Sequence, residues 1–115
     1  IMKVKEISFG SINIDGKDYF MDIVINKGKI EKRKKKQSKK FRSQFGHTPL
    51  TILENIPWDC KKLIIGTGHS SALPVMKEVK KKAKKKGVKL VLMTTPDAIL
   101  NINDKDTNFI LHLAC

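Results

Sequence analysis

The sequence is short of cysteine, arginine and aromatic residues, and it contains no long apolar run. Its two cysteines stand 55 positions apart, which excludes the disulfide framework of a small secreted domain. No apolar stretch approaches the roughly 20 residues that span a bilayer. The opening residues Ile1–Glu6 contain no apolar core of a signal peptide. These absences predict a reduced, cytoplasmic protein that does not enter a membrane.

The length and the apolar content predict one folded domain over residues 1–115. A chain of 115 residues and 13.0 kDa buries roughly two-thirds of the surface that it exposes when unfolded. Apolar residues make up 40% of the chain, enough for a core that needs no disulfide or metal.

Positive charge is abundant, and two short segments carry it. The formal net charge is +13, while residues 27–42 sum to +9 and residues 77–89 sum to +7. Charge runs of this kind indicate a patch for nucleic acid or an acidic membrane surface, or they are simply solvated faces. The candidate basic surface comprises Lys32, Arg33, Lys34, Lys35, Lys36, Lys39, Lys40, Lys81, Lys82 and Lys85.

The excess of lysine over arginine limits the kinds of partner that the basic segments can recognise. Twenty-two are lysines and only two are arginines, whereas base readout and bidentate phosphate contacts favour arginine. Single-strand binding also favours aromatic stacking, and only Phe41 and Phe45 lie in or beside a basic segment. We therefore expect nucleic-acid binding to be weak and non-specific. A lysine-rich surface is also typical of proteins from hot habitats, so a thermophilic origin remains an alternative explanation.

The first half of the chain alternates strands and turns. Residues 4–9 and 12–14 have strand patterns, Asp15-Gly16 is a hairpin turn signal, and residues 19–25 form a mostly apolar strand. A second turn at 26–29 and a returning strand over 30–36 complete a predicted β-meander. Residues 37–50 are predicted to be irregular, with a helical turn over 51–56.

The second half has an α/β pattern. Residues 63–66 and 89–93 are short apolar strands of the kind found buried in parallel sheets. A helix from about 74 to 86 lies between them and ends at Gly87. Thr95 and Pro96 open a second helix as N-cap and first residue, and residues 109–115 form the last strand. The order β-α-β-α-β predicts right-handed crossovers on one sheet.

Two strand-to-helix loops are the candidate ligand site. Ligands of open α/β sheets bind at the carboxyl ends of strands, where exposed backbone N–H groups receive anions. Alternatively, small residues there simply make tight turns, and the sequence lacks both the third glycine of a dinucleotide fingerprint and a P-loop lysine. The candidate ligand-binding residues are Gly66, Thr67, Gly68, His69, Ser70, Ser71, Thr94, Thr95 and Asp97.

Catalytic and metal chemistry finds little support. The residue types of a catalytic triad are present in Ser70, His69 and Asp97. Their spacing argues against a triad, because adjacent serine and histidine side chains rarely face each other. His112 and Cys115 are three residues apart on a predicted strand, so their side chains point to opposite faces. We expect no catalytic residues, no metal site and no cofactor.

Several motifs, in order along nearly the whole chain, resemble one small protein family. They are the hairpin residues 9–17, the strand and turn residues 22–30, Leu63–Gly68 with its loop, Thr94-Thr95-Pro96, and His112 with Cys115 at the end. The chain thereby resembles the family of the adipogenesis-associated domain proteins, which is related to a mitochondrial assembly factor for respiratory complex I. Small microbial members have no known function.

The resemblance implies a fold and a kind of role. The implied fold has three layers, with a mixed five-stranded sheet whose last strand is antiparallel to the others and a β-layer from the N-terminal half on one side. The implied role is that of a non-enzymatic interaction or assembly domain with a protein partner. A small anionic-ligand domain and a non-specific nucleic-acid binder remain the alternatives.

Overall fold

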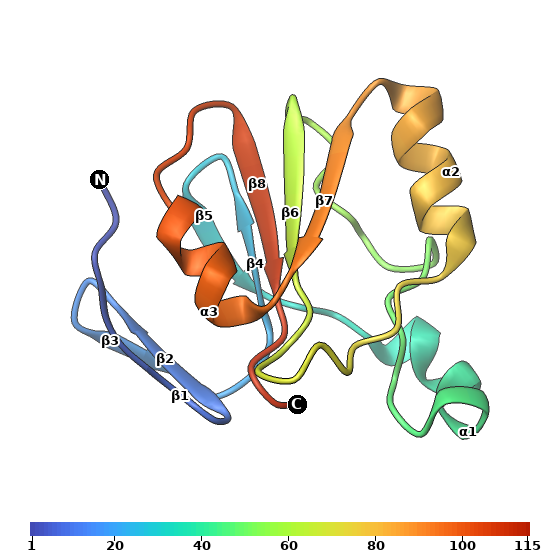
Figure 1. Ribbon diagram of the computed structural model, residues 1–115, viewed down its shortest axis with the longest axis horizontal. Helices are drawn as coiled ribbons and strands as arrows, with labels where there is room; N and C mark the ends of the chain where they lie inside the picture. The colour runs from blue at the N-terminus through green and yellow to red at the C-terminus, as the bar shows by residue number, and fades with distance from the viewer.

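The computed structural model describes all residues from 1 to 115 and contains two sheets (Figure 1). The smaller sheet has three antiparallel strands in the order β1-β2-β3, and the larger has five in the order β5-β4-β8-β6-β7. The strands are β1 (Val4–Ser8), β2 (Ser11–Ile14), β3 (Lys17–Tyr19), β4 (Ile23–Asn26), β5 (Lys29–Lys32), β6 (Lys62–Gly66), β7 (Lys89–Met93) and β8 (Thr107–Leu111). The helices are η1 (Lys36–Phe41), α1 (Arg42–Phe45), α2 (Lys77–Lys86), α3 (Thr95–Ala98) and η2 (Ile99–Asn101).

The larger sheet is mixed, as expected, but its antiparallel member is β4. Strands β6, β7 and β8 run parallel, while β4 is antiparallel to both β8 and β5. The expectation that the last strand is the antiparallel one is therefore wrong in this detail. The two crossover connections make β6, β7 and β8 parallel, whereas the tight turn between β4 and β5 makes an antiparallel hairpin.

Helices cover the two faces of the larger sheet. Val79 of α2 packs on the face that carries Leu63 and Ile65 of β6, and Ala83, one turn further along α2, is also buried. Ala98 of α3 packs on the other face, together with the smaller sheet. The helix α2 ends at Gly87, whose φ of +69° gives the left-handed C-cap that the sequence predicts. Gly87 then leads directly into β7.

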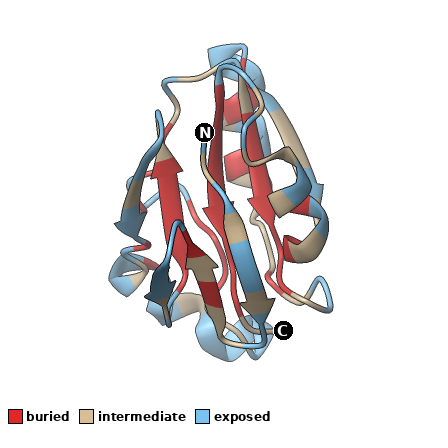
Figure 2. Ribbon diagram, turned by 90° about the vertical axis from the view of Figure 1, so that its left-hand side faces the viewer, coloured by how far each residue is buried: buried red, intermediate tan, exposed pale blue.

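The core is therefore split by the larger sheet into two clusters. One joins Ile12 and Ile14 of β2 to Ile23, Ile64 and Phe109 of the larger sheet. The other lies under α2 and the segment before β6. Figure 2 shows burial concentrated along the central strands, while the outer strands of the smaller sheet stay exposed. The predicted three-layer α/β fold with an N-terminal β-layer is confirmed.

Four local predictions are wrong. The predicted apolar strand over residues 19–25 breaks into β3 and β4, because the chain leaves one sheet and enters the other at residues 20–22. Residues 37–50 contain η1 and α1 rather than an irregular connection, and residues 51–56 form turns rather than a helix. Thr94, not Thr95, is the N-cap of α3, and its side chain accepts a hydrogen bond from the Asp97 N–H.

None of the helices is both long enough and apolar enough to cross a membrane.

Candidate functional site

Three polar residues meet at one end of the larger sheet because of strand register. Asp22 precedes β4, Arg33 follows β5, and His112 follows β8. Ile23 of β4 pairs with Lys32 of β5 and with Leu111 of β8. One residue beyond those pairs, Asp22 therefore lies between Arg33 and His112, although 90 positions separate Asp22 from His112.

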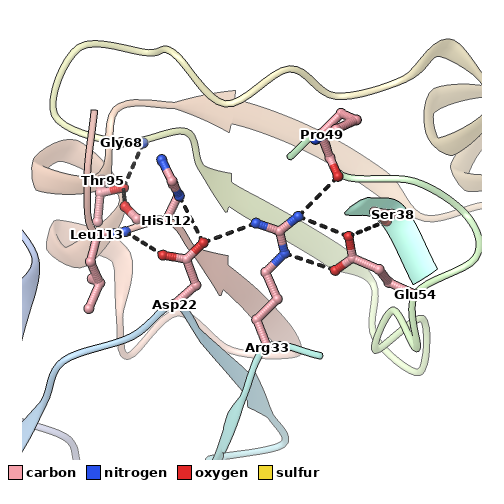
Figure 3. Close-up of polar contacts among 9 residues, drawn as sticks. All are labelled: Asp22, Arg33, Ser38, Pro49, Glu54, Gly68, Thr95, His112 and Leu113. Carbon is pink, nitrogen blue, oxygen red and sulfur yellow. Dashed lines mark hydrogen bonds and ion pairs between the residues drawn. The ribbon is translucent and has the colours of Figure 1, made fainter. Parts of the chain in front are cut away.

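Arg33 is the centre of a buried ion-pair network (Figure 3). Its Nη1 donates to Asp22 Oδ2 at 3.0 Å, while Nε and Nη2 donate to the two carboxylate oxygens of Glu54, each at 2.8 Å. Nη2 also donates to the Pro49 carbonyl. The Arg33 side chain is 1% exposed. This bidentate contact with Glu54 is a geometry that arginine provides and lysine does not.

The two carboxylates have further partners. Asp22 Oδ2 accepts from His112 Nδ1 at 2.8 Å, and Asp22 Oδ1 accepts from the Leu113 N–H at 2.9 Å. Glu54 Oε2 accepts from the Ser38 hydroxyl at 2.6 Å. The network thus joins the β4, β5 and β8 ends to η1 and to the segment before β6.

The network determines the charge state of its members. Burial of the Asp22 carboxyl raises its pKa, but the hydrogen bond and charge of His112, the Leu113 N–H and the charge of Arg33 outweigh burial and lower the pKa to about 2. Burial lowers the pKa of Arg33, but Glu54 and then Asp22 raise it above its usual value. Asp22 and Arg33 therefore stay ionised at neutral pH.

One atom of the network has no partner. His112 Nε2 is buried and makes no hydrogen bond, while the other ring nitrogen binds Asp22. The ring edge faces Gly68, since a Cβ on that glycine would lie 2.9 Å from His112 Cδ2. The orphaned nitrogen is closed off from solvent, so it does not reach a ligand in this conformation.

Above this network lies a hollow of about 640 Å³, which we call the basic hollow. Asp22, Arg33 and His112 contribute to its lining, and Phe20 and Met21 are 71% and 42% exposed beside them. None of its lysines takes part in an ion pair. These lysines are Lys32, Lys34, Lys35, Lys36 and Lys39.

The structure brings the two predicted ligand loops together. The Thr95 N–H donates to the Gly68 carbonyl at 3.0 Å, and the Gly68 N–H donates to Thr95 Oγ1 at 2.9 Å. Thr95 Oγ1 in turn donates to the His112 carbonyl at 2.6 Å. Thr67 Oγ1 donates to the Met93 carbonyl, and Gly66 packs against Thr95. The two loops therefore lie at the same edge of the sheet, as the sequence predicts, and they hydrogen-bond to each other.

The backbone donors of the first loop are occupied by the chain itself. The His69 N–H donates to the Ala114 carbonyl, and the Ser70 N–H donates to the Cys115 backbone oxygen at 2.6 Å. The His69 ring contacts the Ser8 carbonyl, at 3.1 Å from Nε2, and Phe9. Ser70, Ser71 and Asp97 are exposed, and Thr94 caps α3.

The predicted basic surface divides into separate parts. Arg33 does not belong to it, because its side chain is buried in the network. Lys32, Lys34, Lys36, Lys39 and Lys40 are exposed and Lys35 is half-buried. On α2, Lys81 and Lys85 are exposed and Lys82 is half-buried. Figure 1 shows both segments on the right-hand side of the molecule, with the C-terminal end of α2 near the top and η1 near the bottom.

Sequence reasoning missed Asp22, Glu54 and Ser38. The only local signal was Asp22 itself, a carboxylate inside the apolar stretch 19–25. The partners come from elements 11 and 90 residues away, and only the strand register brings them together. The chain has no group of three or more His, Cys, Asp or Glu side chains placed to hold a metal ion.

Comparisons with known proteins agree with the fold and leave the activity open. The family described as "Protein of unknown function (DUF498/DUF598)" matches residues 4–104. The crystal structure of the conserved hypothetical protein PH1505 from Pyrococcus horikoshii OT3 is similar over 99% of this chain and 100% of that one, with 28% identity and a TM-score of 0.82.

More distant structures share the fold alone. A structure titled "MT938" matches over the full length of both chains with 21% identity and a TM-score of 0.73. An outer membrane protein from Bartonella henselae matches over 97% of this chain and 94% of that one, with 13% identity and a TM-score of 0.65. A search of functionally curated proteins found no match.

Proposed function

Because this chain belongs to the DUF498/DUF598 family, whose function is unknown, we propose a function from its own site: it is an interaction domain that binds an acidic segment of a partner protein in the basic hollow. The single observation that carries the proposal is the surplus charge there. Six cationic side chains line the hollow against one carboxylate, that of Asp22. Because none of the lysines has an intramolecular partner, an acidic segment would meet little competition.

The chemistry of the hollow favours a polypeptide over a phosphate. Its accessible cations are lysines, and its one arginine is fully engaged in the network. Rigid recognition of phosphate favours arginine forks, whereas mobile lysines suit dispersed carboxylates. Exposed Phe20 and Met21 add an apolar rim, and aromatic side chains and methionine are enriched at protein interfaces. An acidic segment with apolar side chains between its carboxylates fits both features.

The buried network supports a binding role rather than a catalytic one. Both oxygens of Asp22 and both oxygens of Glu54 accept hydrogen bonds. With a pKa of about 2, Asp22 is a poor base at neutral pH. The network is therefore best explained as a rigid floor that joins three strand ends to η1. The resemblance of the sequence to a family that is related to an assembly factor would agree with such a role.

Binding of a synthetic peptide tests the proposal. The probe is a fluorescent 15-residue peptide of alternating glutamate and leucine, measured by anisotropy at about 50 and 200 mM salt. The double variant Lys35→Glu/Lys39→Glu reverses two charges in the hollow. The matched control Lys81→Glu/Lys85→Glu makes the same change in net charge on α2. We expect the first to weaken binding about tenfold or more and the second to change it less than about threefold.

Two further variants and a competitor sharpen the result. Phe20→Ser should weaken binding if the apolar rim contributes, and Phe45→Ser, at another exposed aromatic side chain in α1 (41% exposed against 71% for Phe20), should not. Equal losses in the two double variants would show that net charge alone attracts the peptide, and would overturn the proposal. Tighter binding of a single-stranded oligonucleotide with the same number of charges would favour the nucleic-acid alternative instead.

A further inference from the structure

The last strand of the larger sheet, β7, has an unpaired edge. It pairs with β6 on one side and ends the strand order on the other. The Lys89 N–H donates to the Lys61 carbonyl and the Thr67 N–H donates to the Met93 carbonyl, so residues 89, 91 and 93 direct their backbone groups to β6. By the alternation of a strand, the N–H and C=O groups of Leu90 and Leu92 point outward and are free to pair.

A shallow apolar groove runs beside this edge. Leu90 and Leu92 lie on the face that α2 covers, because they pair in register with Leu63 and Ile65. With Val88 and Ala83 they line a hollow of about 470 Å³ between β7 and α2. Leu92 is 40% exposed. The groove thus adjoins the two residues whose backbone groups are unpaired.

The rim of the groove is positive. Lys80 and Lys84 of α2 complete its lining, and both are exposed and without an ion pair. The helix as a whole carries seven lysines against Glu78. A second copy of the chain, paired edge to edge, would bring two such helices near each other, and like charges oppose that pairing. The occupant that fits is negatively charged.

The opposite edge of the sheet differs. Strand β5 presents Lys29, Glu31 and Lys32 among its four residues, and charged side chains are a common protection of sheet edges. At β7 the three central residues are leucine, valine and leucine. Charge therefore protects β5, while β7 has an apolar centre and a single lysine, Lys89, at its start.

We propose that the β7 edge binds an extended segment of a partner protein as an additional strand. Its backbone would pair with Leu90 and Leu92, its apolar side chains would enter the groove, and its acidic side chains would meet Lys80 and Lys84. Strand addition derives affinity from main-chain hydrogen bonds and specificity from alternating side chains. This surface is distinct from the basic hollow, so the inference does not depend on the function proposed above.

Amide hydrogen exchange followed by NMR tests the pairing directly. In the free protein, the Leu90 and Leu92 amides should exchange quickly while those of Val91 and Met93 are protected by β6. The probe is a ten-residue peptide in which valine alternates with glutamate, compared with one in which lysine replaces glutamate. The acidic peptide should protect Leu90 and Leu92, and the basic peptide should bind at least about tenfold more weakly.

A charged residue in the groove provides the second measurement. Leu92→Glu should weaken binding of the acidic peptide about tenfold, because it removes an apolar contact from the groove and adds a charge of the same sign as the peptide. Leu100→Glu, at an 81% exposed leucine of η2, is the matched control and should bind normally. The proposal is overturned if the acidic peptide fails to bind at millimolar concentration, binds without protecting the two amides, or is weakened equally by both variants.

Discussion

Two polar regions lie at the same end of the larger sheet and border the same segment, residues 112–115, yet they are built in opposite ways. At the paired 66–71 and 94–97 loops, backbone donors reach the chain's own carbonyls, as His69 and Ser70 do with Ala114 and Cys115. In the basic hollow, five lysines surround a floor in which both carboxylates are fully hydrogen-bonded, and none of these lysines is in an ion pair. Polar residues near a strand end are therefore weak evidence of a site until their partners are known.

The largest expected effect comes from the floor of the hollow. Arg33→Met leaves Asp22 and Glu54 buried without the cation between them, and removing one partner of a buried ion pair costs about 3–5 kcal/mol. Urea unfolding followed by circular dichroism measures the change in the free energy of unfolding. Lys34→Met, one residue along and exposed, is the control and should stay within about 0.5 kcal/mol of the wild type.

A small loss in Arg33→Met would contradict the comparison just drawn. It would mean that the floor tolerates an unbalanced charge, as a solvated surface does, and that water reaches the two carboxylates. The hollow would then be one more hydrated patch rather than a rigid base beneath mobile lysines.

Arg33 also shows where prediction from sequence ends. In the sequence it is one of six consecutive charged residues, 31–36, and nothing local separates it from its lysine neighbours. Its burial follows from the pairing of Ile23 with Lys32, which sets Arg33 beside Asp22, and from Glu54 in a segment that the sequence predicted to be helical. Pairs between distant residues depend on register, and register is a property of the whole sheet.

The elements predicted correctly are those with strong local signals. The apolar runs around Leu63 and Leu90, the left-handed Gly87 and the Asp15-Gly16 turn each specify their structure over a few residues. The division of residues 19–25 between two sheets had no such signal, because apolar residues continue through Phe20 and Met21, where the chain passes from one sheet to the other. The two ligand loops were correctly placed beside each other, but the C-terminal segment that occupies the backbone donors of the first loop was not foreseen.

A substitution at Gly68 tests how tightly residues 112–115 pack against the 66–71 loop. A Cβ at Gly68 would lie 2.2 Å from the carbonyl carbon of Cys115, and its φ is +105°. Gly68→Ala should therefore cost about 3 kcal/mol, from backbone strain and from overpacking together. Gly28→Ala is the matched control, because its φ is also positive, at +80°, but no atom lies within 4 Å of the added carbon. It should cost about 1 kcal/mol.

Thermal and urea unfolding of the two glycine variants give the comparison. If both cost the same, the 112–115 segment moves aside freely, and its carbonyls are a removable cover over the donors of residues 69–72. The anion-binding alternative for those loops would then gain support. A clearly larger loss of unfolding free energy in Gly68→Ala than in Gly28→Ala shows instead that residues 112–115 and the 66–71 loop are packed as firmly as the core.

Of the three changes in stability, we expect the one caused by Asp22→Asn to be the smallest, and it is also the one that depends on pH. The pKa of Asp22 is lowered from 3.8 to about 2 in the folded chain, so its ionised form favours folding. That contribution, about 2 kcal/mol, is fully present above pH 3.8 and is lost as the pH falls through about 2. Asp22→Asn should lower the free energy of unfolding by roughly this amount at pH 7 and by much less near pH 2.

The difference between the two unfolding curves, recorded from pH 7 to pH 2, isolates Asp22 from the other carboxylates. Asp97→Asn, at an exposed carboxylate outside the network, is the control and should give a small difference at every pH. A difference for Asp22→Asn that stays constant down to pH 2 would not follow the protonation of Asp22. It would mean that asparagine destabilises the fold through its packing or hydrogen bonding rather than through the lost charge. A difference that vanishes between pH 4 and pH 2 would establish that the charge of Asp22, held between Arg33 and His112, stabilises the end of the sheet on which the basic hollow is built.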